Sequence, residues 1–125
     1  TLVNDILIPE AKSRNKEITA AVFPGPSLAR TMVRQNWSDR NLDAYLPMLY
    51  HSFYEETPEW VGEMTKEGVG AADPGRLYSG LFVPGIESKD EFEKTLNAAI
   101  NGGAAGVSLF GMKDDYWDTF KKSVS

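Results

Sequence analysis

The 125-residue sequence contains no cysteine and a single histidine. The lack of cysteine excludes disulfides, thiolate catalysis and cysteine-ligated zinc, and one histidine is too few for an ordinary transition-metal centre. We therefore expect neither a metal nor a cofactor. The apolar runs are also short. None approaches the roughly 18 consecutive apolar residues of a transmembrane helix, so no membrane span is expected.

Positive charge is scarce as well. The chain has 13 basic and 18 acidic side chains, which gives a formal net charge of -5, and its longest basic run is Lys121-Lys122. Nucleic acid requires a basic face and an anionic membrane requires a polybasic patch, so we expect neither as a partner. The glycine-rich phosphate motifs, the HExxH zinc motif and the GxSxG nucleophile motif are also absent.

The sequence does contain enough apolar material for one core, with 42% hydrophobic and 11% aromatic residues. Four apolar runs of strand length begin 26 to 33 residues apart, at residues 18–23, 44–50, 77–83 and 104–110. Continuous apolar runs are typical of parallel strands that are covered by helices. Proline at Pro47 weakens this interpretation for the second run, because proline cannot donate a hydrogen bond to a strand ladder.

Helical patterns fill the segments between the runs. An opening helix spans residues 2–11 with a kink at Pro9, and the later helices have starting signals. We expect these starts at Ser27 (a helix to about Gln35), Thr57-Pro58, Ser88 with Glu91, and Asp114 or Asp115. The Thr57 helix is expected to end near Gly68 and Gly70. The pattern is thus a helix followed by four β/α units in a single domain over residues 1–125.

Two α/β architectures fit four such units: a small open sheet, or the (β/α)4 half of a TIM barrel, in which parallel strands alternate with helices. A complete barrel needs about 250 residues. A half-barrel leaves two bare strand edges, so we expect it to pair with a missing N-terminal half or with a second copy of the chain. Because the first residue is Thr1 and not methionine, we interpret the chain as a fragment of a longer protein.

In both architectures ligands bind at the carboxyl ends of the strands. The segment after the second run is the richest, because Tyr50, His51, Tyr54 and Glu55 follow one another there. Aromatic rings with polar tips and carboxylates suit a sugar. The alternative is that His51 and Tyr50 only close the rim of the barrel by hydrogen bonding.

Glu55 is the candidate general acid or base, or a substrate-binding residue, and His51 is the second candidate catalytic residue. The alternative for Glu55, which the sequence favours, is a solvated approach to the following helix, where negative charge is favourable. Asp115 and Trp117, after the fourth run, are candidate sugar contacts, although Asp115 also suits a helix cap. Gly85 and Gly111 follow the third and fourth runs, where some barrels bind phosphate.

Four runs also resemble a known family: ITAAVFP (18–24), MVRQNW (32–37), LPMLYHSFY (46–54) and GAAGVSLF (103–110). In order and spacing they are similar to the bacterial glycosyl-hydrolase-like barrels, also called family 10-like. The likeness covers almost the whole chain and makes it similar to the C-terminal half of that barrel, from its fourth helix to its eighth. It implies a carbohydrate ligand and an exported, periplasmic or cell-surface bacterial protein.

The same resemblance implies that His51 lines a sugar cleft with Tyr50 and Tyr54. The chain departs from barrel glycosidases where it has no carboxylate after its first and third strands, so at least one catalytic carboxylate is expected in the other half. The main hypothesis is a glycoside hydrolase that is inactive as this segment alone. The alternatives are a carbohydrate-binding barrel without catalysis, a phosphate-handling metabolic barrel enzyme, and a fold fragment without activity.

Overall fold

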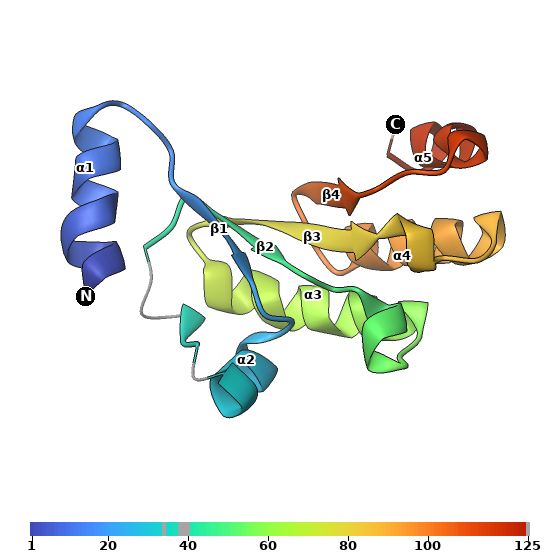
Figure 1. Cartoon of the computed structure of the whole chain (residues 1–125), viewed down its shortest axis with the longest axis horizontal. Helices are drawn as coiled ribbons and strands as arrows, with labels where there is room; N and C mark the ends of the chain where they lie inside the picture. Colours follow the sequence, from blue (N-terminus) through green and yellow to red (C-terminus); the bar gives the residue numbers. More distant parts are fainter. Residues whose placement is uncertain (34, 38–40, 125) are drawn as a thin grey trace.

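The computed structural model describes residues 1–33, 35–37 and 41–124. Helical and strand segments alternate along the chain (Figure 1). The strands are β1 (Thr19–Val22), β2 (Ala44–Pro47), β3 (Arg76–Phe82) and β4 (Gly106–Phe110). The α-helices are α1 (Ile8–Ser13), α2 (Pro26–Val33), α3 (Pro58–Ala72), α4 (Lys89–Asn101) and α5 (Trp117–Val124). Short helical turns are η1 (Leu2–Leu7), η3 (His51–Tyr54), η4 (Val83–Gly85) and η5 (Asp114–Tyr116).

The four strands form one parallel sheet in the order β1-β2-β3-β4. Each strand is followed by a helix and pairs with the next strand along the chain, so the connectivity is (β/α)4. This confirms the predicted fold class, an α/β half of a TIM barrel. Because the strands are parallel, their carboxyl ends lie at the same edge of the sheet, and the arrows of β3 and β4 point to the right in Figure 1.

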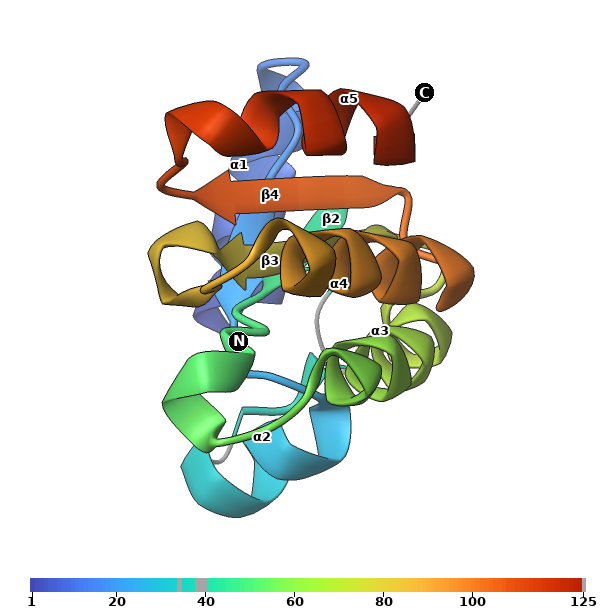
Figure 2. The same cartoon turned by 90° about the vertical axis from the view of Figure 1, so that its right-hand side faces the viewer.

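The two faces of the sheet differ because successive strand residues point to opposite sides. Leu77, Leu81 and Val83 are buried against the helices, in two clusters that together form the core. Figure 2 shows α5, α4, α3 and α2 following one another around this side of the sheet. The opposite face is uncovered and carries a shallow groove of about 340 Å³, whose lining includes Leu46 and Tyr78.

The predicted caps of two helices are confirmed. Ser88 Oγ accepts a hydrogen bond from Glu91 N at 3.1 Å, and Thr57 Oγ1 accepts one from Trp60 N at 3.4 Å. The first helix also changes character just before Pro9, because the π-helical turn η1 ends at Leu7 and α1 begins at Ile8.

Other predicted helix ends are wrong. Ser27 lies inside α2, which begins at Pro26, and the Ser27 N–H donates to Glu67 Oε1 of α3 at 2.8 Å. A carboxylate from a neighbouring helix thus replaces the expected local cap. Helix α3 continues past Gly68 and Gly70 to Ala72 because Gly68 packs directly beneath Leu77 and Trp37. The expected end of α2 near Gln35 adjoins Arg34, which lies outside the described residues.

The start of the last helix also differs from the prediction. Asp114 and Asp115 form the first part of the 3₁₀ turn η5, and α5 begins only at Trp117. Proline at Pro47 is accommodated because β2 ends there and Met48 continues the pairing with Gly80 as an isolated bridge. No helix in the described part of the chain is long and apolar enough to cross a membrane.

Candidate functional site

Four aromatic rings gather at the carboxyl edge of the sheet, and we call them the rim cluster: Tyr50, Phe53, Phe82 and Phe110. The ring of Phe82 lies 4.9 Å from that of Phe53, 5.7 Å from that of Tyr50 and 5.7 Å from that of Phe110, centroid to centroid. Three different strand ends supply these rings. The loop after β2 provides Tyr50 and Phe53, whereas Phe82 and Phe110 are the last residues of β3 and β4.

The rim cluster is open to solvent. The side chains of Phe53 and Phe110 are 63% and 61% exposed, and those of Tyr50 and Phe82 are half-buried. Large rings at this exposure are costly unless something covers them, and a contiguous apolar patch of this kind marks a binding surface. The patch lies where β/α folds bind their ligands.

His51 occupies a different position from the rim cluster. Its side chain is only 4% exposed, and its Nε2 lies 3.4 Å from Glu91 Oε1 in the first turn of α4. The other carboxylate oxygen of Glu91 accepts a hydrogen bond from Glu87 N at 3.0 Å. Glu91 is one-third exposed and lines an open hollow of about 600 Å³. His51 is therefore buried behind a carboxylate that is itself partly exposed.

Tyr54 and Glu55, the other predicted residues of the loop after β2, have different surroundings. Tyr54 is half-buried between Phe23, at 6.0 Å edge-on, and Trp60, at 5.5 Å. Burial raises the pKa of the Tyr54 phenol above its ordinary value of 10.0. Glu55 is exposed and ends the turn η3 in the left-handed conformation, with φ at 54°. Of the residues predicted in this loop, the structure thus puts only Tyr50 in the rim cluster.

Trp117 and Asp115 follow β4 and are both exposed. Trp117 is 45% exposed and contacts Phe120 edge-on at 6.0 Å. Neither residue has a hydrogen bond, ion pair or ring contact with the rim cluster within the described part of the chain.

The glycines of the third and fourth loops have packing reasons for being glycine. A Cβ at Gly111, whose φ is +77°, would lie 2.8 Å from Pro84 Cγ, and one at Gly85 would lie 2.4 Å from Ser52 Oγ. A cation bridges the same two loops, because Lys113 Nζ donates to the carbonyl of Ile86 at 2.6 Å. These loops are therefore held closely together, with one ammonium group between them.

Sequence reasoning missed Phe82, Phe110, Glu91 and Lys113. The signal for the two phenylalanines is present: each is the last residue of its strand, and β3 pairs with β4 so that Phe82 stands opposite Phe110. That pairing depends on register, which short apolar runs do not specify. Glu91 was identified only as part of a cap.

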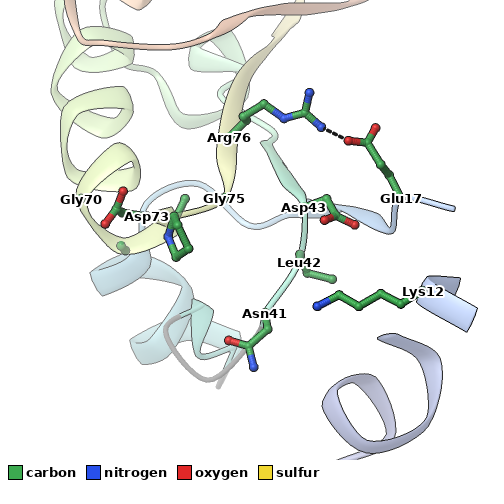
Figure 3. A pocket seen from close by; sticks show the side chains of 12 residues that line it. Lys12, Glu17, Asn41, Leu42, Asp43, Gly70, Asp73, Gly75 and Arg76 are labelled. Atoms are coloured by element: carbon green, nitrogen blue, oxygen red, sulfur yellow. Dashed lines mark hydrogen bonds and ion pairs between the residues drawn. The ribbon is translucent and has the colours of Figure 1, made fainter. Parts of the chain in front are cut away.

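A second hollow lies at the opposite, amino edge of the sheet and has a volume of about 610 Å³ (Figure 3). An ion pair between Arg76 and Glu17 crosses its wall, and Asp43 Oδ2 accepts a hydrogen bond from Ile18 N at 2.7 Å. Lys12 extends toward it from the end of α1. This edge of a barrel serves stability rather than chemistry. Within the described residues, no group of three or more histidine, aspartate or glutamate side chains could hold a metal ion.

No protein-family model matches the chain, and no curated protein matches it either. One solved structure is similar: the apo form, at 1.37 Å resolution, of a "putative deoxyribose-phosphate aldolase" from Toxoplasma gondii ME49. The TM-score is 0.63 at 18% identity, over 89% of this chain and 47% of that one. The chain thus spans about half the length of the barrel it matches. The similarity supports a barrel fold. The matched protein is not named as a glycosidase, so the predicted family resemblance is confirmed only for the half-barrel fold.

Proposed function

We propose that this chain forms half of the substrate site of a β/α-barrel enzyme that acts on a sugar phosphate. The observation that carries the proposal is the exposed rim cluster at the carboxyl edge of the parallel sheet. Ligand sites are lined mainly by apolar and aromatic side chains with a few polar groups that fix orientation. The ring faces of Phe53, Phe82 and Phe110 suit the C–H groups of a sugar, and the Tyr50 hydroxyl suits one of its oxygens.

A sugar phosphate is favoured over a neutral glycan for two reasons. The protein with the similar fold has a name that refers to a phosphorylated sugar. In this chain, Lys113 supplies an ammonium group between the loops after β3 and β4, at the position where barrels commonly bind phosphate. Gly111 lets the loop after β4 approach Pro84 in the loop after β3, and Gly85 lets the loop after β3 approach Ser52 in the loop after β2.

The remaining predicted residues have proposed roles around this site. His51, paired with Glu91, positions the loop that carries Tyr50, and it enters the chemistry only if the loop moves. Glu55 is the candidate acid, base or substrate-binding group, and Tyr54, Asp115 and Trp117 are candidate outer contacts. An aldolase that forms a Schiff base requires a lysine amine. None of the four strands includes a lysine, so this half does not supply that amine from its sheet.

Glycoside hydrolysis is the second candidate. It is favoured by the exposed carboxylates of Glu55 and Asp115 on the carboxyl side of the sheet. The reaction usually needs two carboxyl groups on either side of the scissile bond. Because no carboxylate directly follows β1 or β3, we expect at least one of the two catalytic carboxyl groups in the other half of the barrel.

Thermal unfolding of the chain with three probes distinguishes these functions. We expect 2-deoxyribose 5-phosphate at millimolar concentration to raise the melting temperature more than inorganic phosphate or a neutral cello-oligosaccharide does. Tyr50→Ala and Lys113→Met should each abolish the increase. Met32→Ala is the matched control, because Met32 is 62% exposed on α2 and away from the carboxyl edge.

Each result of the thermal unfolding experiment decides between the candidate functions. A rise with the oligosaccharide alone would replace the first candidate with the second. If none of the three probes changes the melting temperature, the rim cluster is not a sugar site in this chain, and the proposal fails.

A further inference from the structure

Lys113 is a half-buried cation that has no ion pair within the described part of the chain. It directly precedes η5, on the loop after β4. Lys94 and Arg76 each pair with a carboxylate, whereas Asp114 and Asp115, the sequence neighbours of Lys113, are exposed and form no ion pair with it. A charge that is partly withdrawn from water is costly unless other groups compensate it. The groups around this ammonium therefore decide what it can bind.

Two neutral groups hold the ammonium. Lys113 Nζ donates to the Ile86 carbonyl at 2.6 Å and lies 5.1 Å from the centre of the Tyr116 ring, which is within the range of a cation–π contact. The Tyr116 hydroxyl donates to the same carbonyl at 2.9 Å, so both lone pairs of that oxygen are used. We call Ile86, Lys113 and Tyr116 the loop junction, because they join the loops after β3 and β4.

Both neutral members of the loop junction are anchored in the core. Ile86 is fully buried, and its N–H donates to the Val83 carbonyl at 2.9 Å. Tyr116 is 3% exposed, and its ring stacks on that of Phe92 in α4 at 5.1 Å. The Tyr116 N–H also donates to the Lys113 carbonyl at 2.9 Å. The core thus fixes the partners of the ammonium in the chain without a ligand.

We propose that Tyr116 is the positioning residue for the anionic group of the ligand, because its ring holds the Lys113 ammonium in place for a phosphate. This inference rests on the proposed function, since it concerns the phosphate part of the same site. An ammonium has three N–H donors, and the Ile86 carbonyl takes one of them. No other acceptor in the described residues takes the remaining two, which leaves them for phosphate oxygens.

The chemistry of the ring favours an anion as the ligand. A free lysine side chain has many rotamers, and ordering it at the moment of binding lowers the affinity. The face of an aromatic ring attracts a cation without cancelling its charge, so the ammonium keeps its attraction for an anion. A carboxylate in the place of Tyr116 would also order the lysine, but it would neutralise the charge that a phosphate needs.

Titration calorimetry with 2-deoxyribose 5-phosphate tests the role of the ring, at a temperature where circular dichroism shows each variant to be folded. We expect Tyr116→Leu, which lacks the ring, to raise the dissociation constant about tenfold. Tyr116→Phe keeps the ring and loses only the hydroxyl, so its affinity should be closer to that of the unmodified chain than to that of Tyr116→Leu. Added salt should weaken binding to the unmodified chain more than binding to Tyr116→Leu, because the leucine variant makes less use of the ammonium.

Tyr45→Leu is the matched control. Tyr45 is also a buried tyrosine, its ring stacks on that of Trp37, and its hydroxyl donates to a backbone carbonyl, but it belongs to the other core cluster. A purely structural fault lowers the fraction of the chain that binds and leaves the affinity of the folded fraction unchanged. We therefore expect Tyr45→Leu to keep the dissociation constant of the unmodified chain.

The results separate this inference from the proposed function. If Tyr116→Leu binds as tightly as the unmodified chain, or Tyr116→Phe as weakly as Tyr116→Leu, the ring does not position the ammonium and only this inference is wrong. If the unmodified chain binds neither 2-deoxyribose 5-phosphate nor inorganic phosphate, the proposed function fails and this inference fails with it. Tyr116→Met, whose flexible side chain fills the space without a ring, replaces Tyr116→Leu if the leucine variant does not fold, and the same increase is expected.

Discussion

His51 and Glu91 connect the loop after β2 with the first turn of α4. The imidazole is 4% exposed and lies 3.4 Å from a carboxylate that is one-third exposed. This contact holds the buried side of the loop against α4, and the preceding residue, Tyr50, belongs to the rim cluster. The histidine that the sequence singles out is therefore better placed to hold the site than to contact a ligand directly.

Replacing His51 tests its contribution to stability and its effect on ligand binding. We expect His51→Ala to lower the free energy of unfolding by about 1–3 kcal/mol, because it leaves a cavity and removes a buried contact. It should also weaken the sugar-phosphate effect on melting temperature. Urea unfolding measures the first quantity. Glu91→Gln is the control for the charge of the carboxylate. Equal stability of His51→Ala and the unmodified chain would show that the His51–Glu91 contact does not contribute to the free energy of unfolding.

Tyr54 predicts a pH dependence of stability. Burial raises the pKa of its phenol in the folded chain above 10.0, so the folded state holds the proton more tightly than the unfolded state does. The resulting contribution is complete below pH 10 and is lost as the pH rises through the folded pKa. We expect the urea midpoint to fall between pH 9 and pH 11 less steeply in Tyr54→Phe than in the unmodified chain. If the urea midpoints of the two chains fall equally with pH, the raised pKa of the Tyr54 phenol does not contribute to stability.

At the scale of the elements, the start of α4 depends on one hydroxyl. Ser88 Oγ accepts from Glu91 N, whereas Ser27 lies within α2 and its N–H is satisfied by Glu67. We expect Ser88→Ala to destabilise the chain by about 1 kcal/mol. Ser27→Ala, the matched control, should change the free energy of unfolding by less than about 0.5 kcal/mol. Chemical denaturation compares them, and similar losses would mean that Ser27 has a capping role after all.

The elements themselves could largely be predicted from the sequence. Each apolar run overlaps a strand, because residues buried beneath helices must be apolar and the runs have strand length. The ends of the helices were harder to predict. Glu67, 40 residues further along the chain than Ser27, accepts a hydrogen bond in the first turn of α2, and α3 continues through Gly68, which packs against Leu77, and through the exposed Gly70.

The site was predicted less completely than the fold. Tyr50 could be proposed from the sequence because it directly follows an apolar run and has a polar tip, and the structure puts it in the rim cluster. Phe82 and Phe110 look like ordinary strand residues in the sequence, and only the register of β3 against β4 shows that they stand side by side. The sequence also cannot show that His51 turns inward, because a buried and an exposed histidine look the same in a single sequence.

At the scale of the whole molecule, the two unlike faces of the sheet determine how the chain tolerates substitution. Leu77, Leu81 and Val83 are buried against the helices, so their replacement is damaging to the fold. Leu46 and Tyr78 line the groove on the open face and are only half-buried, so their replacement removes less packing within this chain. A saturation mutagenesis library selected for the folded chain would therefore sort the residues of each strand alternately, with a period of two, into intolerant and tolerant positions.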